Sequence, residues 1–160
     1  MADWSEKAKE DGAKGKAEAG LIDEAKPADK KKIAEKAIDY FEKAAAHAKE
    51  HDTLAWALWL QEAAKVHRKL GDHAKAAGIE EDTAKELEKA AKKAADDHDP
   101  ERAGQLERIA QQKWNRASDD RTNSTKPAAP PPDAAKDKDH AKDAGKKAEA
   151  WEKQAANSKP

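Results

Sequence analysis

Alanine takes the place that larger apolar residues hold in most chains, and this restricts the folds that are open to the sequence. The 160 residues include 38 alanines but only 14 residues of Leu, Ile, Val and Phe together. A content of Leu, Ile, Val and Phe this low is common in disordered chains. However, alanine is the best helix former, and a net charge of −1 adds no self-repulsion. The bulky residues concentrate in residues 27–118, so we expect a compact helical core there.

Composition divides the chain into four predicted segments. Residues 1–26 contain three glycines and few large apolar groups, which predicts a flexible tail. Residues 27–118 are predicted to form one helical domain. Residues 119–133 read as a proline-rich linker of extended type. Residues 134–160 are predicted to be a tail that becomes helical when it docks on another surface.

Apolar residues recur at helical spacing within residues 27–118, and helix start and stop signals separate them. Asp52 and Asp99 are expected to cap helices, and Gly71 is expected to end one in a left-handed conformation. The predicted helices span residues 28–50, 53–70, 73–96 and 100–118. The expected fold is therefore all-α: a three- or four-helix antiparallel bundle of helical-hairpin type, with disordered or transiently helical tails.

The second predicted helix carries bulky groups on two faces. One stripe begins at Trp59 and the other at Trp56. A helix that is apolar around much of its girth has neighbours on several sides. We therefore expect both indoles to be shielded by flanking helices that are lined with alanine.

Three stretches resemble tetratricopeptide repeats. They are "EKAIDYFEKAAAHA" (35–48), with Ala37, Phe41 and Ala44; "AAKVHRKLGDHAKAA" (63–77), with Leu70, Gly71, Asp72 and Ala76; and "DPERA" (99–103). The matching alanines, Ala37 and Ala76, are 39 residues apart, whereas the family repeats at about 34. The resemblance implies helical hairpins and a groove that holds a peptide of a partner protein. The two tails are similar in composition to late-embryogenesis-abundant-type proteins.

The leading functional hypothesis is a non-enzymatic protein-interaction or scaffold module that binds a partner helix or peptide, or its own C-terminal helix, on an apolar helical face. That face is predicted around Tyr40, Phe41, Trp56 and Leu60. Trp4 and Trp151 stand alone in polar tails and are candidate anchors, because aromatic residues dominate binding hot spots. The alternatives are a stress-protective, largely unfolded hydrophilic protein and a structural subunit of a larger assembly. Each of these three functions is compatible with self-association of the chain.

Other functions find little support in the residues. There is no cysteine, so disulfides and thiolate metal sites are excluded. His47 and His51 have a spacing that binds zinc, but no acidic residue takes the usual motif position, and solvated surface histidines are expected. We find no catalytic motif, and we expect no enzyme, no metal and no cofactor. Interleaved charges argue against nucleic-acid binding, and no apolar run suits a membrane span. A cytoplasmic location is expected.

Overall fold

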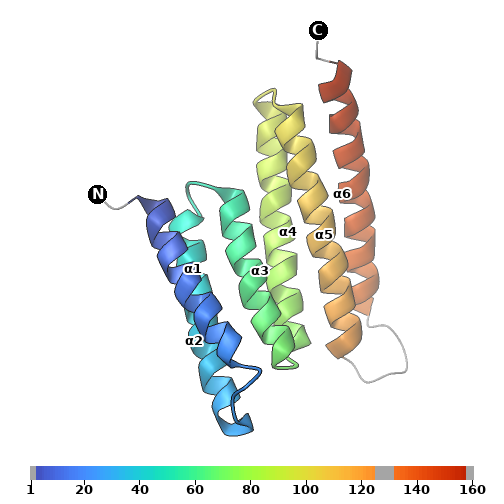
Figure 1. Ribbon diagram of the computed structural model, residues 1–160. Helices are drawn as coiled ribbons and strands as arrows, with labels where there is room; N and C mark the ends of the chain where they lie inside the picture. Colours follow the sequence, from blue (N-terminus) through green and yellow to red (C-terminus); the bar gives the residue numbers. More distant parts are fainter. Residues whose placement is uncertain (1–2, 125–131, 158–160) are drawn as a thin grey trace. The chain divides into compact units, whose positions relative to one another are not determined.

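The chain is all-helical where its structure is described. The computed structural model describes residues 3–124 and 132–157, which contain six helices and no strand (Figure 1). Their bounds are α1 Trp4–Leu21, α2 Pro27–Ala48, α3 Thr53–Lys69, α4 His73–Asp96, α5 Pro100–Ser124 and α6 Pro132–Asn157. The all-α prediction is confirmed, whereas the predicted number of three or four helices is wrong. Within these residues, no helix is both long and apolar enough to cross a membrane.

The two additional helices lie in the segments that were expected to be tails. Asp3 caps α1 by accepting a hydrogen bond from the backbone N–H of Ser5. Gly12 and Gly15, which suggested a flexible segment in the sequence, are buried in α1. They allow α1 to lie close against bulky side chains of its neighbours, so contacts with these neighbours offset the weak helix propensity of glycine. The predicted linker at 119–133 falls partly on residues 125–131, which lie outside the described residues.

The four central helices begin close to the predicted positions, and α2, α3 and α4 also end close to them. The Asp52 carboxylate accepts hydrogen bonds from the N–H groups of Leu54 and Ala55 at the start of α3. Gly71 follows α3 with φ +75°, as expected for a left-handed helix end. The Asp99 carboxylate accepts from the N–H of Arg102 at the start of α5. Helix α5 continues to Ser124, six residues past the predicted end at 118.

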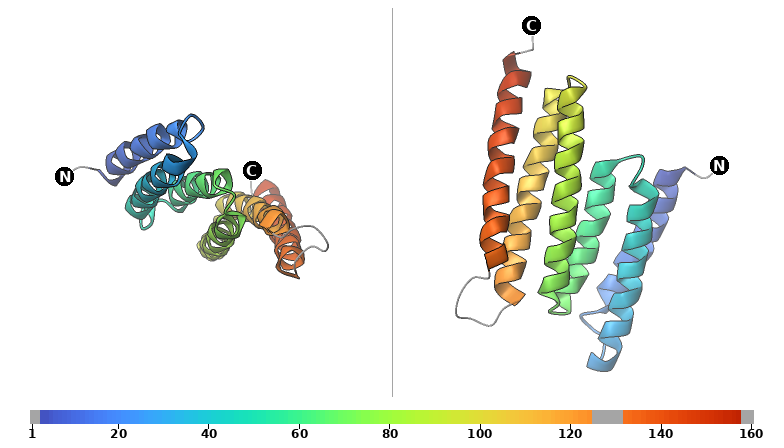
Figure 2. Two further views of the ribbon diagram at one scale, coloured as in Figure 1. Left: turned by 90° about the horizontal axis from the view of Figure 1, so that it is seen from below. Right: turned by 180° about the vertical axis from the view of Figure 1, so that it is seen from behind.

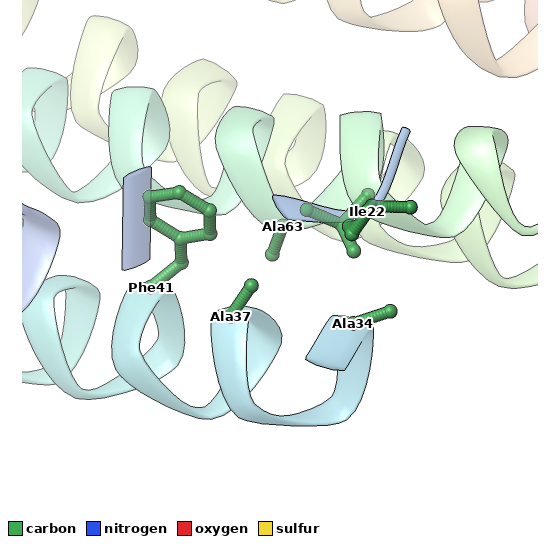
Figure 3. Packing of buried hydrophobic residues seen from close by; sticks show 6 residues of the cluster. Ile22, Ala34, Ala37, Phe41 and Ala63 are labelled. Atoms are coloured by element: carbon green, nitrogen blue, oxygen red, sulfur yellow. The ribbon is translucent and has the colours of Figure 1, made fainter. Parts of the chain in front are cut away.

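The structure divides into two compact units, Met1–Ile79 and Glu80–Pro160, and the boundary between them falls within α4. In the first unit α1 packs on α2, and α2 packs on α3. The core of this unit is Ile22, Ala34, Ala37, Phe41, Ala63 and Val66. Figure 3 shows the side chains of Phe41 and Ala37, from α2, pointing toward Ala63 and Ile22. The expected domain limits at 27 and 118 stay a prediction about independent folding.

In the second unit α4, α5 and α6 run side by side in alternating directions (Figure 2). Small and apolar side chains of these helices are buried: Ala84, Leu87, Ala91 and Ala94 in α4; Ala103, Leu106, Ala110, Trp114 and Ala117 in α5; Ala141, Ala144 and Ala148 in α6. The C-terminal segment therefore docks as a helix on α5.

Alanine forms most of the apolar core in the described part of the chain. The larger buried apolar residues there are Ile22, Phe41, Val66, Leu87, Leu106 and Trp114. Trp114 is the largest of these side chains. Trp56 and Trp59 are half-buried, so their shielding is partial. Because alanine projects so little, neighbouring helices approach closely, and each larger group needs a matching small residue opposite it.

Candidate functional site

An open groove lies between α1 and α3 in the first unit. Its volume is about 410 Å³. Leu58 lines this groove and is 61% exposed, although it is a large apolar residue. The lining residues are Trp4, Ser5, Ala8, Lys9 and Lys16 from α1, Asp52 at the N-terminus of α3, and Ala55, Leu58, Trp59 and Glu62 from α3. The groove therefore combines an apolar floor with a charged rim, which is typical of sites that bind amphipathic segments.

Glycine in α1 positions the floor of the groove. A Cβ atom built on Gly12 would lie 2.1 Å from Cη2 of Trp59, so only glycine leaves room for this indole. The indole in turn stacks on Phe41, with 6.4 Å between ring centroids and 18° between ring planes. A Cβ on Gly15 would lie 2.8 Å from the Phe41 ring. The two glycines thus match the two aromatic rings, and α1 lies directly over them.

Trp4 lines the groove at the first residue of α1. Its indole stacks on the imidazole of His51 at a centroid distance of 5.3 Å and an interplanar angle of 11°. This contact joins the N-terminus of α1 to the turn that precedes α3. Further along, the Asp23 carboxylate meets the Lys69 ammonium at 2.8 Å. Because contacts proceed in the same order along both helices, α1 and α3 run parallel to one another.

The two walls of the groove carry opposite charges. Lys9 and Lys16 extend from α1, and the Lys16 ammonium lies 5.5 Å from the centroid of the Trp59 ring. Asp52 and Glu62 extend from the α3 side. The Glu62 carboxylate also meets Lys65 Nζ at 2.6 Å, so part of its charge is compensated within α3.

The structure separates the residues that the sequence suggested as a single binding face. Phe41 is only 1% exposed and lies beneath α1. Tyr40, Trp56 and Leu60 are half-buried in α2 and α3, and the Lys43 ammonium lies 5.7 Å from the centroid of the Tyr40 ring. These residues do not line the groove described above. Their role in partner binding stays a prediction.

The two isolated tail tryptophans have different positions. Trp4 lines the groove beside Trp59 and Leu58. Trp151 is half-buried in α6, within the second unit. The suggestion that both anchor a partner stays a prediction, but only Trp4 lies at this groove.

Leu58 and the two rim lysines are residues that sequence reasoning missed. Leu58 lies outside both apolar stripes of α3, on the face that also carries Glu62, Lys65 and Lys69. An isolated leucine on an otherwise charged helix face was therefore a usable signal. Lys9 and Lys16 gave no such signal, because lysines occur throughout the predicted tail.

Two histidines of the first unit, His47 and His51, make structural contacts. His47 Nε2 lies 3.2 Å from the Asp11 carboxylate, and His51 stacks on Trp4. Among the described residues, no group of three or more His, Cys, Asp or Glu side chains is arranged to hold a metal ion.

Polar side chains are buried in the alanine-rich second unit. Lys113 Nζ lies 3.3 Å from Oε2 of Glu80, and these side chains are 2% and 1% exposed. The buried polar residues there are Glu80, Thr83, Glu107, Lys113, Ser118, Asp120 and Asp137. Ser118 Oγ donates to the carbonyl of Ala134 at 2.9 Å, and Trp114 Nε1 donates to Glu88 at 2.9 Å. These contacts join α5 to both of its neighbours.

Glu107 is a buried acid whose environment favours its protonated form. Burial raises the pKa of its carboxyl to about 7, Lys147 opposes this shift, and Glu88 adds to it. Its Oε2 atom is buried without a hydrogen-bond partner among the described residues. The folded unit therefore favours the neutral acid below a pH of about 7.

The second unit is accordingly expected to lose stability as the pH rises. The folded-state pKa of Glu107 lies above the ordinary value of 4.5, so its stabilising contribution is complete below pH 4.5 and is lost as the pH rises to about 7. Replacing Glu107 by glutamine removes this titration. We expect Glu107→Gln to match the wild type at acid pH and to exceed its free energy of unfolding by about 3 kcal/mol at pH 8.

Urea unfolding at a series of pH values measures this difference. Asp119→Asn is the matched control, because Asp119 is exposed on the same helix. Parallel stability profiles for the wild type and Glu107→Gln would contradict the prediction.

Comparisons with protein-family models, curated proteins and solved structures found no match for this chain. The six helices that the described residues form are compatible with a helical-repeat-like fold.

Proposed function

We propose that this protein is a non-enzymatic interaction module that binds the apolar face of a partner helix in the groove between α1 and α3. The observation that carries the proposal is the exposed apolar side chain of Leu58, which stands beside the half-buried indole of Trp59 in an open groove. Water contact with such a group is unfavourable, and burial of one leucine stabilises a complex by about 2 kcal/mol. Helix-in-groove binding uses this kind of surface.

The proposal differs from the sequence-based hypothesis in the location of the site. Phe41 is covered by α1, so it supports the groove from beneath and does not contact a partner. Trp4 and Trp59 supply aromatic contact area, and aromatic side chains lose little conformational entropy when they bind. The partner helix would add a neighbour to the two parallel helices α1 and α3. A scaffold role follows if that helix belongs to a larger protein.

A single charged substitution tests the groove. Leu58→Asp is expected to weaken binding of a synthetic amphipathic helix with a leucine stripe by about 30-fold, because the apolar contact is lost and a carboxylate would have to be desolvated. Leu21→Asp is the matched control, since Leu21 is 53% exposed in the same unit but does not line this groove. Titration calorimetry gives both affinities. Equal affinities of the two variants, or no saturable binding to the wild type, would refute the proposal.

The proposal also requires a folded module in dilute solution. Circular dichroism is expected to show strong helicity and a cooperative thermal transition, because the alanine core must be packed before the groove exists. Weak helicity without a cooperative transition would instead favour the stress-protective alternative.

A further inference from the structure

The opposite charges on the two groove walls restrict the kind of helix that fits. Lys9 and Lys16 both extend from α1, whereas Asp52 and Glu62 both belong to the α3 side. Lys9 and Lys16 are seven residues apart, which corresponds to two helical turns and about 10 Å. A partner helix in the groove therefore passes between a basic wall and an acidic wall for at least two turns.

The basic wall makes the larger contribution. The Asp52 carboxylate already accepts two backbone hydrogen bonds as the cap of α3, and Glu62 is bound by Lys65. Both lysines of α1 are exposed at the rim, and the Lys16 ammonium is held over Trp59. An acidic partner side chain can approach these ammonium groups without displacing a capping interaction. Charge complementarity at such a rim contributes more to the specificity for one partner over another than to the affinity.

We propose that the partner is an amphipathic helix whose apolar stripe is bordered by acidic residues on the flank facing α1 and by basic residues on the flank facing α3. This inference rests on the proposed function, because it specifies the occupant of the same groove. Acidic residues seven positions apart would match Lys9 and Lys16. Turning a helix end for end exchanges its flanks, so the two walls also select one direction of binding.

Three synthetic helices of about 18 residues, or five turns, test the inference. They share one leucine stripe and differ in their flanks: acidic on one side and basic on the other, basic on both sides, or acidic on both sides. Wild-type protein is expected to bind the mixed peptide most tightly. The double variant Lys9→Glu, Lys16→Glu makes both walls acidic and is expected to prefer the peptide with two basic flanks. Between the wild type and this variant, the ratio of the affinity for the mixed peptide to the affinity for the peptide with two basic flanks should change by about tenfold. The change is modest because each exposed ion pair contributes little.

A matched variant separates this effect from net charge. Lys7→Glu, Lys31→Glu changes the charge by the same amount at two exposed positions outside the groove, and it should keep the wild-type preference. The neutral variant Lys9→Gln, Lys16→Gln should lose the preference without gaining the opposite one, which guards against misfolding of the charge-reversed chain. The preferences should weaken at about 1 M salt, where exposed charges are screened.

The outcomes separate the two proposals. Equal binding of all three peptides, or an unchanged order of affinities in the Lys9→Glu, Lys16→Glu variant, overturns the inference about the flanks and leaves the helix-binding groove intact. Absence of binding by every peptide overturns both. Self-association that competes with the peptides would make a second copy of this chain the occupant and would also overturn the inference.

Discussion

Replacing Lys113 by methionine is expected to lower the free energy of unfolding of the second unit by about 3–5 kcal/mol, because one partner of a buried ion pair is removed. The Lys113 ammonium faces the Glu80 carboxylate at 3.3 Å, and neither side chain is more than 2% exposed. The substitution removes the ammonium while the carboxylate stays buried, and methionine has a similar length and retains most of the packing.

A double variant shows whether charge or shape causes this loss. Replacing Glu80 by leucine together with Lys113→Met removes both charges, and it is expected to recover most of the stability, as replacement of a whole buried pair often does. Lys92→Met controls for loss of a lysine at an exposed position in α4. Urea unfolding followed by circular dichroism gives the four free energies. If Lys113→Met lowers stability no more than Lys92→Met does, the pair does not stabilise the unit.

Replacing both Gly12 and Gly15 by alanine is expected to destabilise the first unit by about 3 kcal/mol, because each new methyl group would overlap an aromatic ring. The new Cβ atoms would lie 2.1 Å from the Trp59 indole and 2.8 Å from the Phe41 ring. The rings stack on one another, so neither can move without disturbing the other. We expect α1 to separate from α2 and α3, with an increase in acrylamide quenching of tryptophan fluorescence.

Gly20 provides the matched control for these substitutions. It lies in the same helix, and a Cβ atom there would meet nothing within 4 Å. Because alanine has the higher helix propensity, Gly20→Ala is expected to stabilise α1 by up to about 1 kcal/mol. Replacing glycine by alanine should therefore lower the free energy of unfolding at positions 12 and 15 and raise it at position 20 of the same helix. Stabilisation by all three alanines would show that α1 does not pack closely on the aromatic rings.

The central helices could be predicted from the sequence because their signals are local. The spacing of Ala103, Leu106 and Ala110 predicts a buried stripe, and this stripe is buried. Asp99 followed by Pro100 predicts a helix start, and α5 begins at Pro100. Caps and periodicity act within a few residues of one another, so no knowledge of distant neighbours is needed.

The candidate site could not be predicted in the same way. The sequence suggested Phe41 as part of an exposed face, but α1 covers it. Gly12 and Gly15 suggested flexibility in the sequence, because glycine weakens an isolated helix. In the structure the two glycines instead stabilise the packing of α1, because each faces an aromatic ring that would overlap a larger side chain. These rings are dozens of residues away along the chain, so the sequence near the glycines does not reveal them. Leu58 is the exception, since its position outside the apolar stripes was visible in the sequence.

The sequence by itself determined that the chain is helical, where its central helices begin, and that alanine must form most of the core. Propensity, capping and periodicity are properties of short segments, and they need no partner to operate. Only the tertiary structure decided that α1 and α6 are packed helices, that Phe41 is covered, and that a groove with walls of opposite charge lies between α1 and α3. These features depend on which side chains meet across helices, and the small residues that permit such contacts look the same in a loose tail as in a tight interface.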